Sequence, residues 1–146
     1  MVRSCKGEDH LRKNETVSLA LVCRILLAVV LAGSGIGKLQ DLDDSRQMMV
    51  DFGLPYALAR PTGTFLPGIE LGVAVALLVG PTSWWGAWAA LGLLAAFTLA
   101  VGLNMAAGRR PDCKCFGSLH VATIGWRVLS RNLALMALAA VVLLKG

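Results

Sequence analysis

Four long apolar runs constrain this chain more than any other feature of its sequence. They cover residues 19–39, 64–80, 84–104 and 126–144. Each is close to the roughly 20 residues that a helix needs to cross a hydrocarbon core about 30 Å thick. Because backbone polar groups find no water in that core, each run must satisfy them within itself, as an α-helix does. The sequence therefore predicts an all-α, polytopic membrane protein built as a bundle of four transmembrane helices.

The composition supports a membrane class. Of the 146 residues, 56% are hydrophobic and only 16% are charged, which is too apolar for a soluble domain of this length. The polar residues gather mainly near the N-terminus and in two connections, so we expect residues 1–17 to form a flexible polar tail and residues 18–146 to form the membrane domain. The net charge of +5 suits segments that face anionic headgroups. The expected partner is the lipid bilayer, and no basic-aromatic pattern points to nucleic acid.

An even number of spans places both termini on one face. The short connection around Pro81 belongs to that face, whereas the longer segments 40–62 and 106–125 lie on the other. Arg12 and Lys13 precede the first span and favour cytoplasmic termini, although the total of Lys and Arg in the two long segments favours the opposite orientation. We expect a multi-pass protein of the cell membrane with both long segments outside the cytoplasm.

Glu70 is the acidic residue within the predicted spans, where a carboxylate is costly unless it is paired, protonated or hydrated. Counting from Thr62 and Trp126 at about 1.5 Å per residue puts Glu70 and Arg131 at similar depths, so we expect these two to pair. Lys38 and Asn132 are predicted to lie at the same end of the bundle. The cluster is either functional or a pin that only fixes helix packing.

Small residues indicate how the predicted helices approach one another. Gly68, Gly72, Ala76 and Gly80 recur every four residues along the second span, a spacing that permits close backbone contact between membrane helices. Pro67 in the same span is expected to free a backbone carbonyl close to Glu70.

The segment Cys113-Lys114-Cys115 lies in the second long connection. Two thiols this close can form a strained, readily reduced disulfide, and the charge of Lys114 would stabilise a thiolate. Cys113 and Cys115 are therefore the candidate catalytic residues, with Lys114, Glu70, Arg131, Asn132 and Lys38 as supporting residues. The alternatives are an inert brace, or two thiolates that hand on a soft metal ion. His120 brings too few further ligands for us to predict a resident metal site.

Several of these motifs together resemble the MauE family, which is related to the DoxX-like four-helix membrane proteins. The resemblance is carried by Arg24, Gly35-Ile36-Gly37-Lys38-Leu39, Pro67-Gly68-Ile69-Glu70, Cys113-Lys114-Cys115-Phe116-Gly117, Gly125-Trp126-Arg127 and Arg131-Asn132. It implies a bacterial membrane protein that assists the maturation of methylamine dehydrogenase alongside an extracytoplasmic, thioredoxin-like partner. Lys114 departs from the pattern, because the family often has Gly there.

Two functions are compatible with these observations. One is a membrane thiol-disulfide redox and maturation factor, in which the Cys-x-Cys loop exchanges electrons with the thioredoxin-like partner. A membrane quinone is then one candidate electron acceptor, although the sequence fixes no cofactor. The other is a non-enzymatic membrane transport or assembly factor that binds a soft metal or braces a docking loop.

Overall fold

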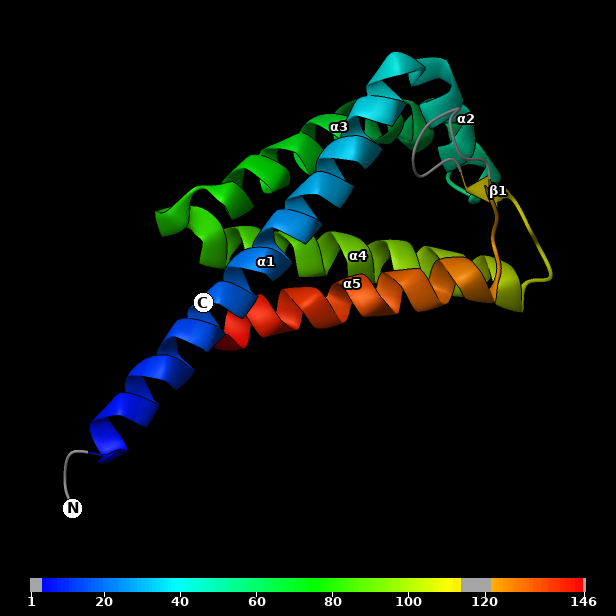
Figure 1. Ribbon diagram of the computed structural model, residues 1–146. Coiled ribbons are helices and arrows are strands. Elements are labelled where there is room, and N and C mark those ends of the chain that lie inside the picture. Colours follow the sequence, from blue (N-terminus) through cyan, green and yellow to red (C-terminus); the bar gives the residue numbers. More distant parts are fainter. Residues whose placement is uncertain (1–3, 114–121, 146) are drawn as a thin grey trace.

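The computed structural model describes residues 4–113 and 122–145, and within them the chain is dominated by helices (Figure 1). Four helical segments in the described part of the chain are long and apolar enough to cross a membrane, as the sequence predicts. One of them joins a short 3-10 helix to the long helix that follows it. The elements in chain order are α1 (Ser4–Gln40), α2 (Leu42–Asp51), α3 (Tyr56–Leu78), the short 3-10 helix η1 (Gly80–Thr82), α4 (Ser83–Ala106), the strands β1 (Asp112–Cys113) and β2 (Ala122–Thr123), and α5 (Trp126–Lys145).

The long helices form two pairs. α1 packs mainly on α3, and α4 packs mainly on α5. Figure 1 shows these pairs converging at the end that carries η1 and the C-terminus, and diverging toward the end that carries α2 and β1. The long connections therefore lie together at one end of the bundle, opposite the C-terminus and the start of α1.

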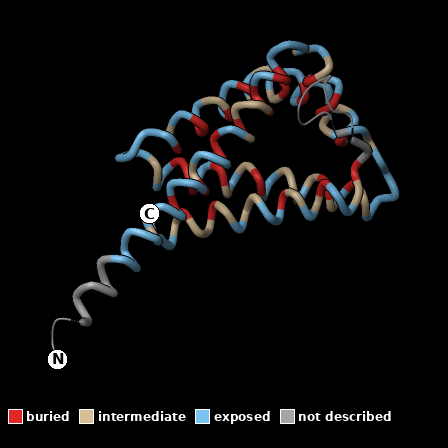
Figure 2. The backbone as a smooth tube through the Cα atoms, in the orientation of Figure 1, coloured by how far each residue is buried: buried red, intermediate tan, exposed pale blue. Residues whose placement is uncertain are grey.

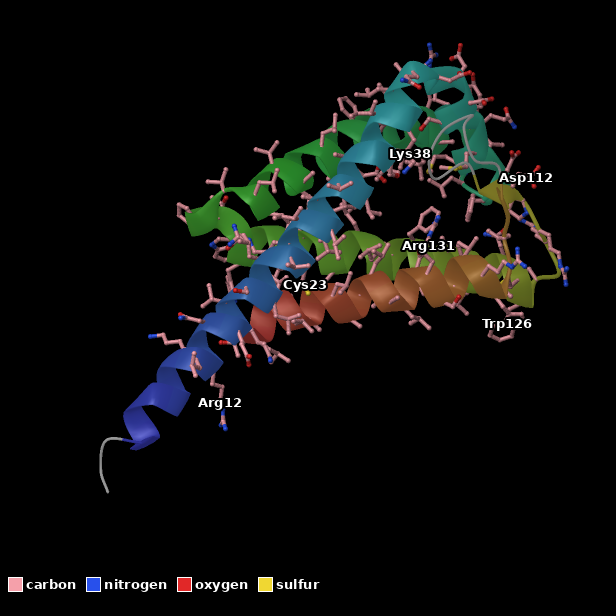
Figure 3. The ribbon with its side chains drawn as sticks, in the orientation of Figure 1. Arg12, Cys23, Lys38, Asp112, Trp126 and Arg131 are labelled. Carbon is pink, nitrogen blue, oxygen red and sulfur yellow. The ribbon has the colours of Figure 1, made fainter. Side chains whose placement is uncertain are left out.

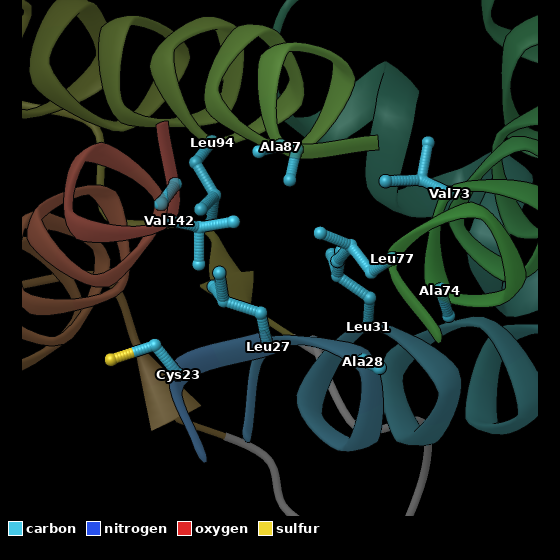
Figure 4. Close-up of a cluster of buried hydrophobic side chains, with 12 residues drawn as sticks. Cys23, Leu27, Ala28, Leu31, Val73, Ala74, Leu77, Ala87, Leu94 and Val142 are labelled. Atoms are coloured by element: carbon cyan, nitrogen blue, oxygen red, sulfur yellow. The ribbon is translucent and has the colours of Figure 1, made fainter. Parts of the chain in front are cut away.

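The converging end holds a dry apolar core. Leu27 of α1, Leu77 of α3, Ala87 of α4 and Val142 of α5 are almost fully buried there (Figure 4), and the buried residues follow the inner faces of the helices (Figure 2). A Cβ on Gly86 would lie 2.9 Å from the backbone nitrogen of Leu77, so α4 begins in direct contact with the backbone of α3.

Arg24 closes the same end of α3. Its Nε donates to the carbonyl of Leu77 at 2.8 Å and its Nη2 donates to the carbonyl of Leu78 at 3.3 Å. The last carbonyls of a helix lack partners within the helix and carry partial negative charge, so a guanidinium is well suited to this position.

Helix α1 extends further than the sequence analysis expected. It begins at Ser4, so most of the segment expected to be a flexible tail is helical. Residues 4–17 include no proline. An acidic residue precedes a basic one by four positions at Glu8 and Arg12 and again at Asp9 and Lys13, a spacing that favours helices. A helix that is already nucleated in the span can propagate through such residues.

Helix α2 lies in a segment that was expected to be only a connection. Asp41 caps its start by accepting from the backbone N–H of Asp44 at 3.0 Å. Met48, Met49 and Phe52 share one face and pack with Val101 and Ile124 in a second apolar cluster. The helix therefore covers the diverging end of the bundle.

Helix α3 also begins earlier than expected, at Tyr56 rather than residue 64, and continues through Pro61 and Pro67. Proline at position 67 cannot donate to the carbonyl of Gly63 four residues earlier. Ser45 Oγ of α2 donates to that carbonyl instead, at 2.9 Å. The carbonyl without a helical donor therefore lies about two turns before Glu70 rather than close to it, and it becomes the attachment point of α2.

The close approaches do not follow the predicted stripe of small residues. A Cβ on Gly68, Gly72 or Gly80 would meet no other heavy atom within 4 Å, whereas one on Gly63 would lie 2.7 Å from Arg46 Cα. The glycines of the stripe face away from the neighbouring helices, whereas Ala76 lies against Gly86 of α4. A four-residue repeat marks a face of a helix without saying what covers that face.

We predict that Gly63→Ala destabilises the protein, since the new methyl group meets the backbone of α2, which cannot move aside as a side chain can. Overpacking of this kind costs about 1–3 kcal/mol. Thermal unfolding in detergent should show a lowered midpoint. Gly68→Ala is the matched control in the same helix, and its midpoint should stay unchanged or rise slightly because alanine favours helix. Equal midpoints for the two variants would contradict the close α2–α3 contact.

Candidate functional site

Buried polar side chains gather where the two helix pairs diverge. Lys38 of α1, Glu70 of α3 and Asn132 of α5 are 4%, 8% and 2% exposed. Lys38 Nζ forms a buried ion pair with Glu70 Oε1. An ammonium and a carboxylate that are each costly alone in a low-dielectric interior thereby neutralise one another.

Gly35 allows this pair to form. A Cβ at residue 35 would lie 3.0 Å from the carbonyl oxygen of Pro67 and 3.4 Å from Glu70 Cβ. Because glycine has no side chain, α1 can approach α3 closely one turn before Lys38. The Gly-x-Gly-Lys part of the sequence thus acts through packing: glycine brings the backbones together, and lysine reaches the carboxylate.

The structure corrects the expected partner of Glu70. The predicted direct pair with Arg131 is replaced by the pair with Lys38, while Arg131 lines the same cavity from α5. The predicted depth of Glu70 assumes that its helix enters the membrane near Thr62, whereas α3 begins at Tyr56. It also could not tell that α1, rather than α5, is the helix packed most closely on α3.

A cavity of about 70 Å³ lies beside the ion pair. Figure 3 shows Lys38 and Arg131 on opposite sides of the space between the α1–α3 and α4–α5 pairs. The polar lining is Ser34, Lys38, Glu70, Arg131 and Asn132, and leucine, valine and Phe97 side chains form the rest of the wall. All of these polar residues except Ser34 are among the residues that the sequence predicts at this end of the bundle.

Glu70 and Asn132 each place in this lining a polar atom that lacks a hydrogen-bond partner among the described residues. These atoms are Glu70 Oε2 and Asn132 Nδ2, one an acceptor and the other a donor. Asn104, at the end of α4, is in contrast satisfied, because its Nδ2 donates to the carbonyl of Phe52 at 3.0 Å and to that of Ala100 at 2.9 Å. Asn104 therefore ties α4 to the end of α2, outside the cavity lining.

The cysteine segment is held at the same end of the molecule. β1 and β2 pair antiparallel, with Cys113 opposite Ala122, so the ends of the loop between them are brought together. Asp112 lines a surface cavity together with Asp44, Gln47 and Asp51 of α2. Lys114 and Cys115 lie outside the described residues, as does the side chain of Cys113, so their predicted roles stay predictions.

Cys23 has a different environment. It is 3% exposed and packs in the dry core near Leu27. Figure 3 shows Cys23 and Asp112 in separate parts of the bundle, with Cys23 toward the converging end. As a buried thiol among apolar side chains, it has the surroundings of a structural cysteine rather than a reactive one.

Comparison with known proteins gives a consistent match. The family model described as "Methylamine utilisation protein MauE" matches residues 16–145. Proteins named "Methylamine utilization protein MauE" from Paracoccus denitrificans and Methylorubrum extorquens are 35% and 38% identical to this chain, over 80% of its length in each case. The chain spans 63% of the length of each of these two relatives. No solved structure matches it.

We predict that Lys38 and Glu70 behave as a coupled pair. Lys38→Met or Glu70→Gln alone leaves one partner buried without its counter-charge, at a cost of about 3–5 kcal/mol, and the double variant should recover part of that loss. Thermal unfolding in detergent measures the cycle. The exposed pair Asp43–Arg46 of α2 is the control, because Asp43→Asn should cost at most about 1 kcal/mol. Additive losses for Lys38 and Glu70 would contradict their coupling.

Proposed function

Because this chain belongs to the MauE family, we propose that it is a membrane protein of methylamine utilisation whose Cys113–Cys115 loop carries out thiol-disulfide exchange with an exported, thioredoxin-like partner. The role would be maturation of methylamine dehydrogenase or of a similar disulfide-containing enzyme. The membrane itself is the second partner, since four helices have the length and composition of spans.

The position of the cysteine segment is the observation that carries this proposal. The β1–β2 pairing holds both ends of the loop at the edge of the bundle, beyond the end of α4 and before the start of α5. A thiol outside the spans can meet a water-soluble protein, which a thiol within a span cannot. Rapid exchange requires access as well as a stabilised thiolate.

Each step of the proposed exchange transfers two electrons and two protons. In exchange, a loop disulfide takes two electrons and two protons from the dithiol of the partner, which leaves the partner oxidised and Cys113 and Cys115 reduced. Regeneration of the loop disulfide needs an oxidant. A membrane quinone would accept the two electrons and two protons and become a quinol. Lys114 would assist by stabilising the loop thiolate that leaves when the partner's thiolate attacks the disulfide.

We predict that Cys113 and Cys115 form a reversible intrachain disulfide. Alkylation mass shifts in a graded dithiothreitol buffer should change by two thiols at one midpoint. Cys23 should not change with the buffer, because its burial protects it, and Cys23→Ser should leave the midpoint where it was. A pair that remains two free thiols under strong oxidant would favour the transport or assembly function with thiolate-bound metal.

We also predict that the cysteine loop faces the outside of the cell. A membrane-impermeant maleimide added to intact cells should label the reduced loop of the Cys5→Ser, Cys23→Ser variant. A single cysteine introduced at Arg12, on the opposite side of the predicted bundle, should be labelled only after lysis. The reverse pattern would place the loop in the cytoplasm and exclude exchange with an exported partner.

A further inference from the structure

The polar cavity between the helix pairs has a composition that the proposed thiol chemistry does not explain. Its described walls supply an acceptor in Glu70 Oε2 and a donor in Asn132 Nδ2 that meet no partner within the described part of the chain. These atoms come from α3 and α5, and both side chains are at least nine-tenths buried. Leaving a buried polar atom unsatisfied costs about 1–3 kcal/mol, and more for a charged group.

The size and polarity of the cavity limit what can satisfy both atoms. The ligand must both donate and accept a hydrogen bond and must fit within about 70 Å³. One water needs about 10–15 Å³ on this measure, so roughly five molecules can enter, whereas an apolar cavity that admits an aromatic ring has about 150 Å³. In this arrangement of the helices the cavity is too small for a quinone ring and large enough for water.

We propose that this cavity is a hydrated site, in which a few water molecules donate to Glu70 Oε2, accept from Asn132 Nδ2 and join the two helix pairs. Waters with several polar partners are stable parts of protein interiors. Lys38 already pairs with one oxygen of the Glu70 carboxylate. In this site the second oxygen, Oε2, contacts water molecules, which can exchange protons with it. Asn132 binds water in this site, and the site does not depend on the redox state of the cysteine loop.

Radiolytic hydroxyl-radical labelling of the full chain in lipid nanodiscs, with water enriched in ¹⁸O, tests the proposal because radicals form from water at the site. Leu31 and Leu94 are 5% and 8% exposed and line the cavity, whereas Leu27 and Leu77 are 0% exposed and belong to the same apolar cluster without lining the cavity. Leu31 and Leu94 should be oxidised several-fold faster than Leu27 and Leu77. Equal rates would overturn the proposal.

Two variants separate the water site from general loosening. Asn132→Leu replaces the donor by an apolar side chain and should reduce the labelling of Leu31 and Leu94 to the level of Leu27. Leu133→Ala alters the neighbouring, exposed position of α5 and should leave the labelling unchanged. Persistent labelling in Asn132→Leu would overturn the assignment of Asn132. Should that variant fail to fold, the comparison among leucines in the unaltered chain still decides the proposal.

The same labelling in a Cys113→Ser, Cys115→Ser variant distinguishes this inference from the proposed function. The labelling pattern should be retained without the thiols, because none of the polar groups that line the cavity is a cysteine. Loss of the pattern in this variant would show that the water depends on the loop and would overturn the independence of the two sites.

Discussion

The ion pair between Lys38 and Glu70 joins α1 to α3 at the depth where the bundle begins to open. A charge in the membrane interior is tolerated when it is paired or hydrated, so the pair restricts how these two helices can slide or rotate. Gly35 shortens the distance between the backbones, so that the carbonyl oxygen of Pro67 lies against it. The position of α2 depends on the same proline, because Ser45 occupies the carbonyl of Gly63 that proline leaves without a donor.

The bundle is therefore divided into two chemically different halves. Toward the C-terminus, leucine, alanine and valine from four helices form the larger apolar cluster. Toward α2, a second apolar cluster of Met48, Met49, Phe52 and their neighbours covers a polar interior. The dry half fixes the arrangement of the helices, while the other half holds charge, unsatisfied donors and acceptors, and the ends of the cysteine loop. Chemistry is concentrated where packing is less complete.

Local patterns in the sequence predicted the spans well, because length and hydropathy directly measure what a bilayer requires. They did not predict which groups meet. The partner of Glu70 depends on which helix lies next to α3, and that is a property of the whole bundle. Helix α2 was missed because it is short and mostly polar, although Asp41 and the spacing of Met48 and Phe52 signal a capped amphipathic helix. The close glycine contacts at Gly35, Gly63 and Gly86 are isolated positions rather than a repeat.

The length of α1 has a mechanical consequence. Its 37 residues extend about 55 Å at 1.5 Å per residue, and a hydrocarbon core takes up about 30 Å of that length. About 25 Å of continuous helix therefore stands clear of the core as a lever that shares its axis with the helix bearing Lys38. A headgroup or another protein that tilts this extension therefore also tilts the segment that bears Lys38, because the two belong to one continuous helix.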